Sequence, residues 1–150
     1  MEKRIENIEE LGAEAKLLVV TLAPGERATL VTLSGELGAG KTTFTQLVAK
    51  ELGIIETITS PTFVLEKIYD LPESAVFKKL VHIDAYRLTA GRDLKALGFD
   101  ELLSDGSNLI LLEWPERVAD ALPRAHISIT LVPELDGSRT MTQTSFQTHG

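Results

Sequence analysis

A glycine-rich segment has the residue types and spacing needed to hold a chain of phosphates. Residues 35–42 read Gly-Glu-Leu-Gly-Ala-Gly-Lys-Thr and fit the pattern G-x-x-x-x-G-K-[ST]. Glycines permit positive φ angles and let backbone N–H groups come close to an anion. Lys41 adds a point charge for the β- and γ-phosphate oxygens, and the Thr42 hydroxyl suits a bridging magnesium ion. The motif therefore predicts an ATP or GTP site, in preference to a strand–helix turn with an incidental lysine.

Two carboxylates follow apolar runs that read as buried strands. Asp84 comes directly after residues 80–83, and Glu113 comes directly after residues 109–112. Acids at such strand ends face the phosphates in this class of fold, and a carboxylate there is costly unless wetted, paired or metal-bound. Spacing alone does not rank the two. Asp84 could instead cap a turn or pair with Arg87, and Glu113 could be a solvated acid.

Three further side chains are close in sequence to these candidates. Thr62 lies in a Ser-Pro-Thr segment where many NTPases place a hydroxyl that senses the γ-phosphate and metal, although an ordinary turn is the alternative. Trp114 follows Glu113, so we expect it beside the site or at an exposed edge. His82 lies within an apolar run, which favours a satisfied core histidine over a metal ligand.

The elements that must position these residues alternate between helical and strand patterns. Residues 5–22 have helical spacing, and the gap at 70–75 is too short for a helical crossover, so the strands around it should be antiparallel. We expect strands at 28–33, 63–69, 76–83 and 109–112, helices at 42–52 (capped by Gly53), 93–103 (with a kink or break at Gly98) and 115–122, and a hairpin of 126–132 and 139–145 around Asp136-Gly137.

This pattern predicts one α/β domain over residues 1–150, a single-domain P-loop NTPase fold with a mixed parallel/antiparallel sheet flanked by helices. Within it we expect an N-terminal helical segment at 1–27, a C-terminal β-hairpin at 125–146 and a frayed tail at 147–150.

Composition limits the classes of partner. The 150 residues include 15 Lys+Arg and 22 Asp+Glu, a formal charge of −7, which disfavours direct binding to DNA or tRNA because phosphate contacts need basic clusters. There is no cysteine, which excludes disulfides and thiolate chemistry. No apolar run approaches the roughly 20 residues of a membrane span, and the N-terminus alternates charges. We expect a cytoplasmic protein that does not bind a membrane.

Four blocks together resemble the TsaE family, also called YjeE, of small bacterial ATPases. They occur in the family's order and spread over roughly residues 28–139. The last three are far more specific than the phosphate-binding loop. The blocks are residues 33–44, Ser60-Pro61-Thr62-Phe63, residues 82–88 (His-Ile-Asp-Ala-Tyr-Arg-Leu) and Glu113-Trp114-Pro115.

The resemblance implies a function in the bacterial machinery that makes threonylcarbamoyladenosine at position 37 of tRNA. TsaE proteins act with the TsaB–TsaD pair, bind and hydrolyse ATP with Mg²⁺, and turn over slowly alone. Any tRNA contact would then be indirect, through the partners.

The resemblance also implies roles for single residues. Asp84 matches an acid required for activity, and Thr42 and Glu113 would approach the magnesium ion. Lys41, Asp84 and Glu113 are thus the catalytic candidates. The nucleotide-binding candidates are Gly38, Ala39, Gly40, Lys41, Thr42, Thr43, Thr62, Trp114 and Arg139.

The match to the family is incomplete. Glu36 and Ala85 depart from the family's usual Asp and Leu, and the N-terminal helix matches poorly, so the contacts to adenine are left unassigned.

Two other functions use the same loop. A small-molecule kinase would need a second pocket and an arginine-rich lid, whereas Arg87, Arg92 and Arg117 are scattered. A nucleotide-sensing module without useful turnover would not need the acids that are present.

Overall fold

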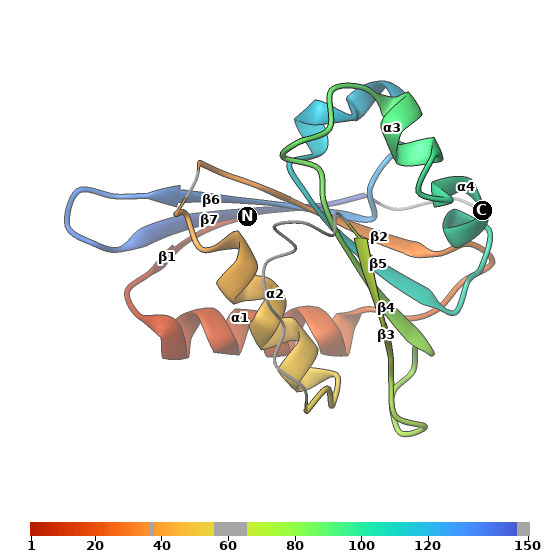
Figure 1. The fold of residues 1–150 in the computed structure, drawn as a ribbon. Coiled ribbons are helices and arrows are strands. Elements are labelled where there is room, and N and C mark those ends of the chain that lie inside the picture. The colour runs from red at the N-terminus through yellow and green to blue at the C-terminus, as the bar shows by residue number, and fades with distance from the viewer. Residues whose placement is uncertain (37, 56–65, 147–150) are drawn as a thin grey trace.

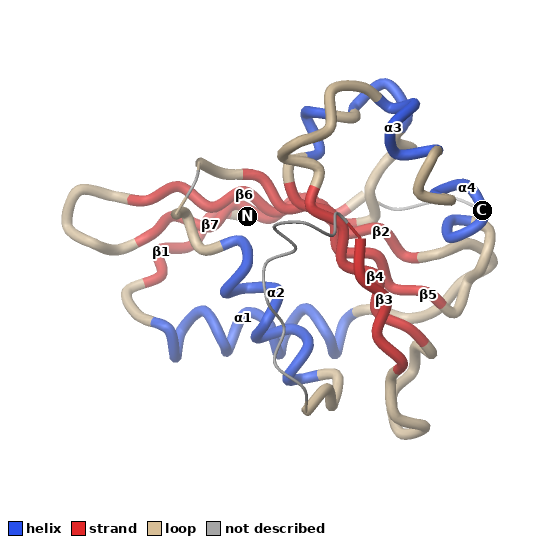
Figure 2. Tube along the Cα trace, in the orientation of Figure 1, coloured by secondary structure: helices blue, strands red, loops and turns tan. Residues whose placement is uncertain are grey.

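A mixed β-sheet forms the centre of the computed structural model, which describes residues 1–36, 38–55 and 66–146 (Figures 1 and 2). Its described strands are β1 (Glu2–Ile5), β2 (Thr29–Ser34), β3 (Glu66–Asp70), β4 (Lys79–Asp84), β5 (Asn108–Glu113), β6 (Ile127–Pro133) and β7 (Arg139–Ser145). Their order across the sheet is β1-β7-β6-β2-β5-β4-β3.

The four central strands β6, β2, β5 and β4 run parallel, and the outer pairs are antiparallel. β3 pairs antiparallel with β4 across the short connection, as the sequence predicts, and β6 pairs antiparallel with β7. The two innermost strands, β2 and β5, are mostly apolar and almost fully buried, as expected for parallel strands covered on both faces. The predicted mixed parallel/antiparallel sheet is confirmed.

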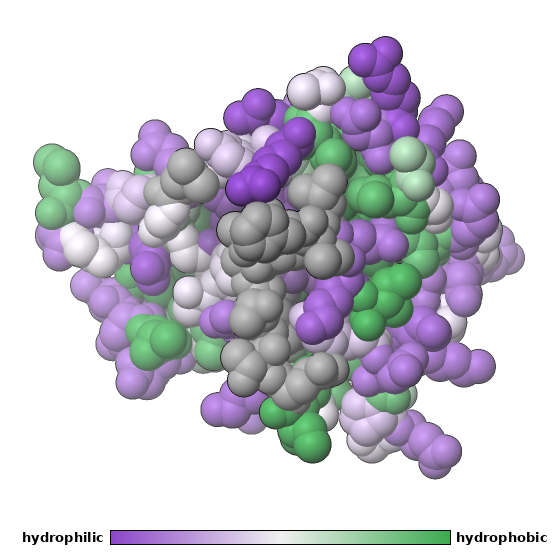
Figure 3. Space-filling view, viewed as in Figure 1, coloured by the Kyte–Doolittle hydropathy of each residue, from purple (hydrophilic) through white to green (hydrophobic). Residues whose placement is uncertain are grey.

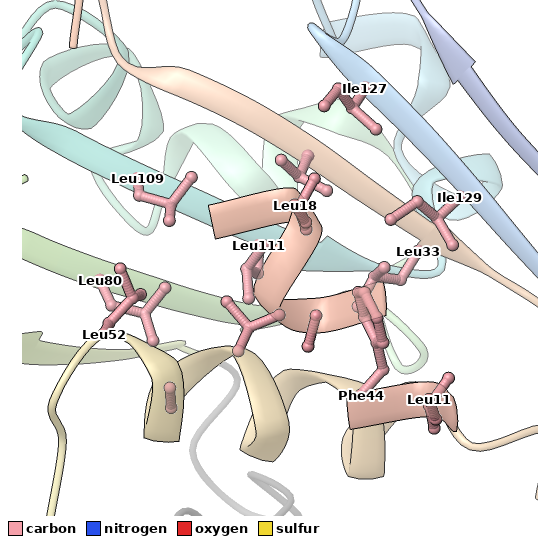
Figure 4. Packing of buried hydrophobic residues seen from close by; sticks show 14 of the residues in the cluster. Leu11, Leu18, Leu33, Phe44, Leu52, Leu80, Leu109, Leu111, Ile127 and Ile129 are labelled. Atoms are coloured by element: carbon pink, nitrogen blue, oxygen red, sulfur yellow. The ribbon is translucent and has the colours of Figure 1, made fainter. Parts of the chain in front are cut away.

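Two helices cover one face of the sheet and shorter ones cover the other (Figure 1). On the first face lie α1 (Ile8–Thr21) and α2 (Lys41–Glu51), whose buried Leu11 and Phe44 pack toward Leu33 and Leu111 of the sheet (Figure 4). The second face is covered by α3 (Gly91–Lys95), α4 (Phe99–Leu103) and the 3₁₀ turns η1 (Pro115–Arg117) and η2 (Ala119–Ala121).

The structure differs from the sequence prediction at several elements. Residues 2–5 form the edge strand β1, and the first helix begins only after Asn7, whose side chain accepts a hydrogen bond from the Glu10 N–H. The predicted break at Gly98 (φ 78°) is confirmed and divides this helical stretch into α3 and α4, but α3 begins at Gly91, two residues before the predicted start.

The predicted short helix at 115–122 is wrong. It is replaced by η1 and η2, because Val118 between them has φ −131° and ψ 22°, which is not helical and so interrupts the segment. The strand start at 63–65 and the tail at 147–150 lie outside the described residues.

Hydrophilic side chains dominate the face seen in Figure 3, and the hydrophobic ones form separate small patches. Within the described ranges, none of the helices is both long enough and apolar enough to span a bilayer.

The first glycine of the glycine-rich loop must be a glycine because β6 lies directly against it. Gly35 has φ +149°, and a Cβ there would collide with the backbone carbonyl oxygen of Leu131. Gly38 also has positive φ (+82°), but no described atom lies within 4 Å of the Cβ position.

We therefore expect Gly35→Ala to lower the free energy of unfolding by about 3 kcal/mol, from steric clash, as is typical of overpacking. Gly38→Ala should cost only about 1 kcal/mol, from left-handed strain alone. Urea unfolding monitored by circular dichroism measures both, and equal losses would contradict this assignment.

Candidate nucleotide site

The candidate residues meet because three parallel strands end in register. Leu33 of β2 pairs with Glu113 of β5, and Glu113 pairs with Asp84 of β4. Backbone hydrogen bonds continue this row past the strand ends, from the Trp114 N–H to the Leu33 carbonyl (3.1 Å) and from the Ala85 N–H to the Glu113 carbonyl (3.0 Å). The loop that follows β2 and the two acids therefore share one edge of the sheet.

The glycine-rich loop leads directly into the first turn of α2. Gly40 precedes the helix in the left-handed region (φ 102°), and its carbonyl accepts the Phe44 N–H at 2.8 Å. Gly40 has no side chain that could cap this helix start, so it leaves the first N–H groups of the helix available to an anion. Ala39 is fully buried beneath the loop, which anchors the turn.

Lys41 folds back over its own loop. Its ammonium donates hydrogen bonds to the carbonyls of Gly35 and Glu36, the latter at 3.0 Å. Burial lowers the pKa of the Lys41 ammonium, while the carboxylates of Glu113 and two other nearby acids oppose that shift. The charge thus sits in a largely desolvated position, where its attraction for a phosphate is stronger than in water.

Glu113 occupies the floor of the site and is only 2% exposed. Its Oε1 accepts a long hydrogen bond from the Thr42 hydroxyl at 3.4 Å, and its Oε2 lies 2.5 Å from Nε2 of His82. A hydroxyl and a carboxylate are the hard oxygen donors that magnesium prefers, with phosphate oxygens and water completing its shell. The described residues hold no cluster of three or more His, Cys, Asp or Glu suited to a metal. The donor set therefore fits a magnesium ion that a nucleotide brings.

Asp84 lies beside Glu113 at the end of β4. Its Oδ1 accepts the Tyr86 N–H at 3.0 Å, and burial raises the pKa of its carboxyl group. The hydrogen bond from Tyr86 agrees with the alternative that Asp84 caps a turn, whereas no ion pair among the described residues joins Asp84 to Arg87.

An aromatic and cationic rim borders the loop. Trp114 (φ 62°) is the non-glycine residue with positive φ in the described ranges, and its ring lies 4.1 Å from the Lys41 ammonium. Tyr86 packs on Trp114 with ring centroids 4.9 Å apart, and the Arg117 guanidinium lies over both rings at 5.3 and 5.8 Å. Trp114 is therefore beside the site, as expected.

One pocket of about 240 Å³ gathers most of the candidates. It is smaller than the roughly 300–1,000 Å³ typical of small-molecule sites, so its size suits the phosphate end of a nucleotide. Arg139 reaches it from β7, with its guanidinium 3.2 Å from the point where a Cβ on Gly40 would lie. The lining residues are Gly38, Gly40, Lys41, Thr42, Thr43, Asp84, Glu113, Trp114 and Arg139.

One predicted residue lies outside the structure's described ranges, and three residues near the site were not predicted from the sequence. Thr62 lies outside the described residues, so its predicted role stays a prediction. In the sequence alone, Tyr86 carries no separate signal, Arg117 is one of several scattered cations, and His82 has the pattern of a core histidine. Their place at the candidate site depends on contacts across strands and turns. Only His82 had a signal in the sequence, because it lies two residues before Asp84 and therefore on the same face of the strand.

A larger cavity of about 680 Å³ lies at the other end of β2. Ala28, Leu30 and Leu103 contribute to its lining, and these residues are remote from the loop that follows Ser34. The residues that line this cavity include neither the glycine-rich loop nor the paired acids, so the candidate site is the smaller pocket.

A parallel-centred α/β sheet whose second strand runs through a glycine-rich loop into a helix defines a protein of the P-loop NTPase fold. The sequence model of the family "Threonylcarbamoyl adenosine biosynthesis protein TsaE" matches residues 4–141. The chain belongs to the TsaE family.

Individual relatives agree with this assignment. The chain is 37% identical over 145 residues to the tRNA threonylcarbamoyladenosine biosynthesis protein TsaE of Bacillus subtilis, covering 95% of this chain and 84% of that protein. It is 40% identical to the TsaE protein of Treponema pallidum over 78% of this chain and 82% of the relative. The crystal structure of Bacillus subtilis YdiB superposes with a TM-score of 0.75 at 34% identity, covering 98% of this chain and 86% of YdiB.

The raised pKa of Asp84 predicts how this carboxyl group changes the free energy of unfolding with pH. Folding favours the protonated carboxyl, so this contribution is fully present below the ordinary aspartate pKa and is lost as pH rises through the raised folded value. Without nucleotide and metal, Asp84→Asn should raise the free energy of unfolding by about 1 kcal/mol at neutral pH, and the gain should vanish on acidification.

Asp93 is a control because its pKa shifts in the opposite direction from that of Asp84. Hydrogen bonds from the Thr89 N–H and hydroxyl lower the pKa of Asp93, so Asp93→Asn should destabilise at neutral pH and have no effect in acid. Urea unfolding over a pH series measures both variants. A neutral-pH loss of stability in Asp84→Asn would contradict the assignment.

Proposed function

We propose that this protein is an ATPase subunit of the bacterial machinery that makes threonylcarbamoyladenosine at position 37 of tRNA, acting with the TsaB–TsaD pair. The observation that supports it most is the gathering of Lys41, Thr42, Asp84 and Glu113 around one pocket in a chain of the TsaE family.

Each residue has a distinct part in the proposed reaction. The loop N–H groups and Lys41 bind the β- and γ-phosphates, and Thr42 and Glu113 hold the magnesium ion. The bound ion supplies charge neutralisation on the phosphates. Asp84 orients the attacking water and accepts its proton as the new bond to the γ-phosphorus forms and the bond to ADP breaks. Its raised pKa brings it closer to the pH at which such a base is most effective.

The rim favours hydrolysis over transfer to a small molecule. A kinase lid needs mobile arginines that close over the phosphates. Arg117 instead packs on Tyr86 and Trp114 at the edge of the pocket. The free energy of hydrolysis is then used to change an interface with partner proteins. Because this chain has a formal charge of −7, the partners bind the tRNA in its place.

Removing the loop lysine tests the nucleotide site directly. Lys41→Ala should weaken ATP binding by about 10- to 100-fold, because a hydrogen bond to a charged group contributes about 1.5–3 kcal/mol. Lys50→Ala, on the exposed far end of α2, is the matched control and should bind as the unaltered protein does. Isothermal titration calorimetry measures both. Equal affinities for the two variants would contradict the assignment.

Phosphate release tests the activity and the partnership together. The chain alone should hydrolyse ATP slowly, and the TsaB–TsaD pair with substrate tRNA should raise the rate. Asp84→Ala should keep ATP affinity but lose about 100-fold in turnover, the usual scale for a general base. Asp100→Ala, an exposed acid on α4, is the control.

Other outcomes favour the alternatives. ATP binding with no turnover in the full mixture would favour a nucleotide sensor. Labelled phosphate found in a metabolite, rather than released, would favour a kinase.

A further inference from the structure

A buried histidine contacts the carboxylate at the floor of the site. His82 lies on β4 with no exposed surface, two residues before Asp84, and its Nε2 is 2.5 Å from Oε2 of Glu113. Leu80, His82 and Asp84 share one face of their strand, since side chains alternate. This face is the one beneath α2, to which Leu80 contributes core packing.

The chemistry of the pair sets the direction of this hydrogen bond. An ionised carboxylate only accepts, so Nε2 must carry the proton that it donates to Glu113. The other ring nitrogen, Nδ1, is buried and has no hydrogen-bond partner among the residues that the structure describes. A neutral imidazole with its proton on Nε2 leaves Nδ1 as a bare acceptor, which costs less than a buried, unpaired N–H.

The hydrogen bond fixes how the Glu113 carboxylate is turned. With Oε2 held by His82, Oε1 faces the Thr42 hydroxyl at 3.4 Å. Outer partners of this kind orient a metal-binding oxygen and change metal affinity by about 10- to 100-fold when removed.

We infer that His82 is a positioning residue, which aims Oε1 of Glu113 toward Thr42 and so prepares the oxygen pair for the nucleotide's magnesium ion. The inference rests on the proposed function, because it assumes that this pair holds the metal. His82 does not contact the phosphates; it acts through Glu113. This role differs from that of a purely structural core histidine. A structural histidine would support the fold equally whether ATP binds with Mg²⁺ or without it.

The experiment compares three substitutions of similar size. His82→Leu removes the donor, His82→Gln keeps an N–H near the position of Nε2, and His82→Asn places its N–H near Nδ1, too short to reach Glu113. ATP affinity is measured by calorimetry with Mg²⁺ and with EDTA, and thermal unfolding is recorded for each variant without ligand.

For His82→Leu and His82→Asn we expect the gain in affinity that Mg²⁺ provides to fall by about tenfold, with the EDTA affinity unchanged. His82→Gln should restore most of the gain. Should His82→Leu fail to fold, the Gln and Asn variants carry the same comparison with two polar side chains.

Two results would overturn the inference: an unchanged Mg²⁺ gain in the Leu and Asn variants, or equal losses with Mg²⁺ and EDTA, which indicate a structural role. Both leave the proposed metal site standing if Glu113→Gln abolishes the gain. If the unaltered protein binds ATP equally with and without Mg²⁺, the proposed metal site fails, and the inference fails with it.

Discussion

The register of β4, β5 and β2 is the constraint on which the rest of the site depends. Side chains alternate between faces along each strand, so a slip of one residue would move Glu113 from beneath the loop to the opposite face. The apolar residues preceding each acid prevent such a slip, because it would also exchange the contents of both cores. Ile110 and Leu112 pack on the α3 and α4 side, whereas Leu109 and Leu111 pack under α1 and α2. Core packing thus positions the carboxylates.

The same arrangement places charges where they are costly. Glu113 is 2% exposed and Lys41 is 5% exposed, and among the described residues neither forms an ion pair with a Lys, Arg, Asp or Glu side chain. Carbonyl oxygens hold the ammonium, and a hydroxyl and an imidazole hold the carboxylate. Desolvation destabilises the protein without ligand, but it strengthens attraction for a phosphate or a cation. The two hydrophobic cores offset this cost, which is how a small domain can keep a polar floor under a loop.

Much of this architecture is readable from the sequence, for physical reasons that can be named. The loop at 35–42 is local, so its pattern alone predicts the strand, turn and helix around it. Asp84 and Glu113 are predictable because apolar runs define strand ends, and parallel strands bring those ends together. The strand β1 was not predictable, since three of its four residues are charged and the strand pairs only with the distant β7. The contact between His82 and Glu113 likewise depends on a register that no single segment encodes.

Trp114 shows how one strand end serves two sides of the pocket. Its left-handed backbone costs about 1–3 kcal/mol for a bulky residue, so the surroundings must stabilise it. Stabilisation comes from the Lys41 ammonium and from Tyr86 and Arg117, whose contacts require the ring at this point. Because Glu113 immediately precedes it, the sharp turn delivers a carboxylate to the floor and an indole to the rim from adjacent residues. A helical or extended conformation at Trp114 would relieve the strain, but it would move the ring away from the lysine. The strain is therefore the cost of placing the Glu113 carboxylate and the aromatic rim on adjacent residues.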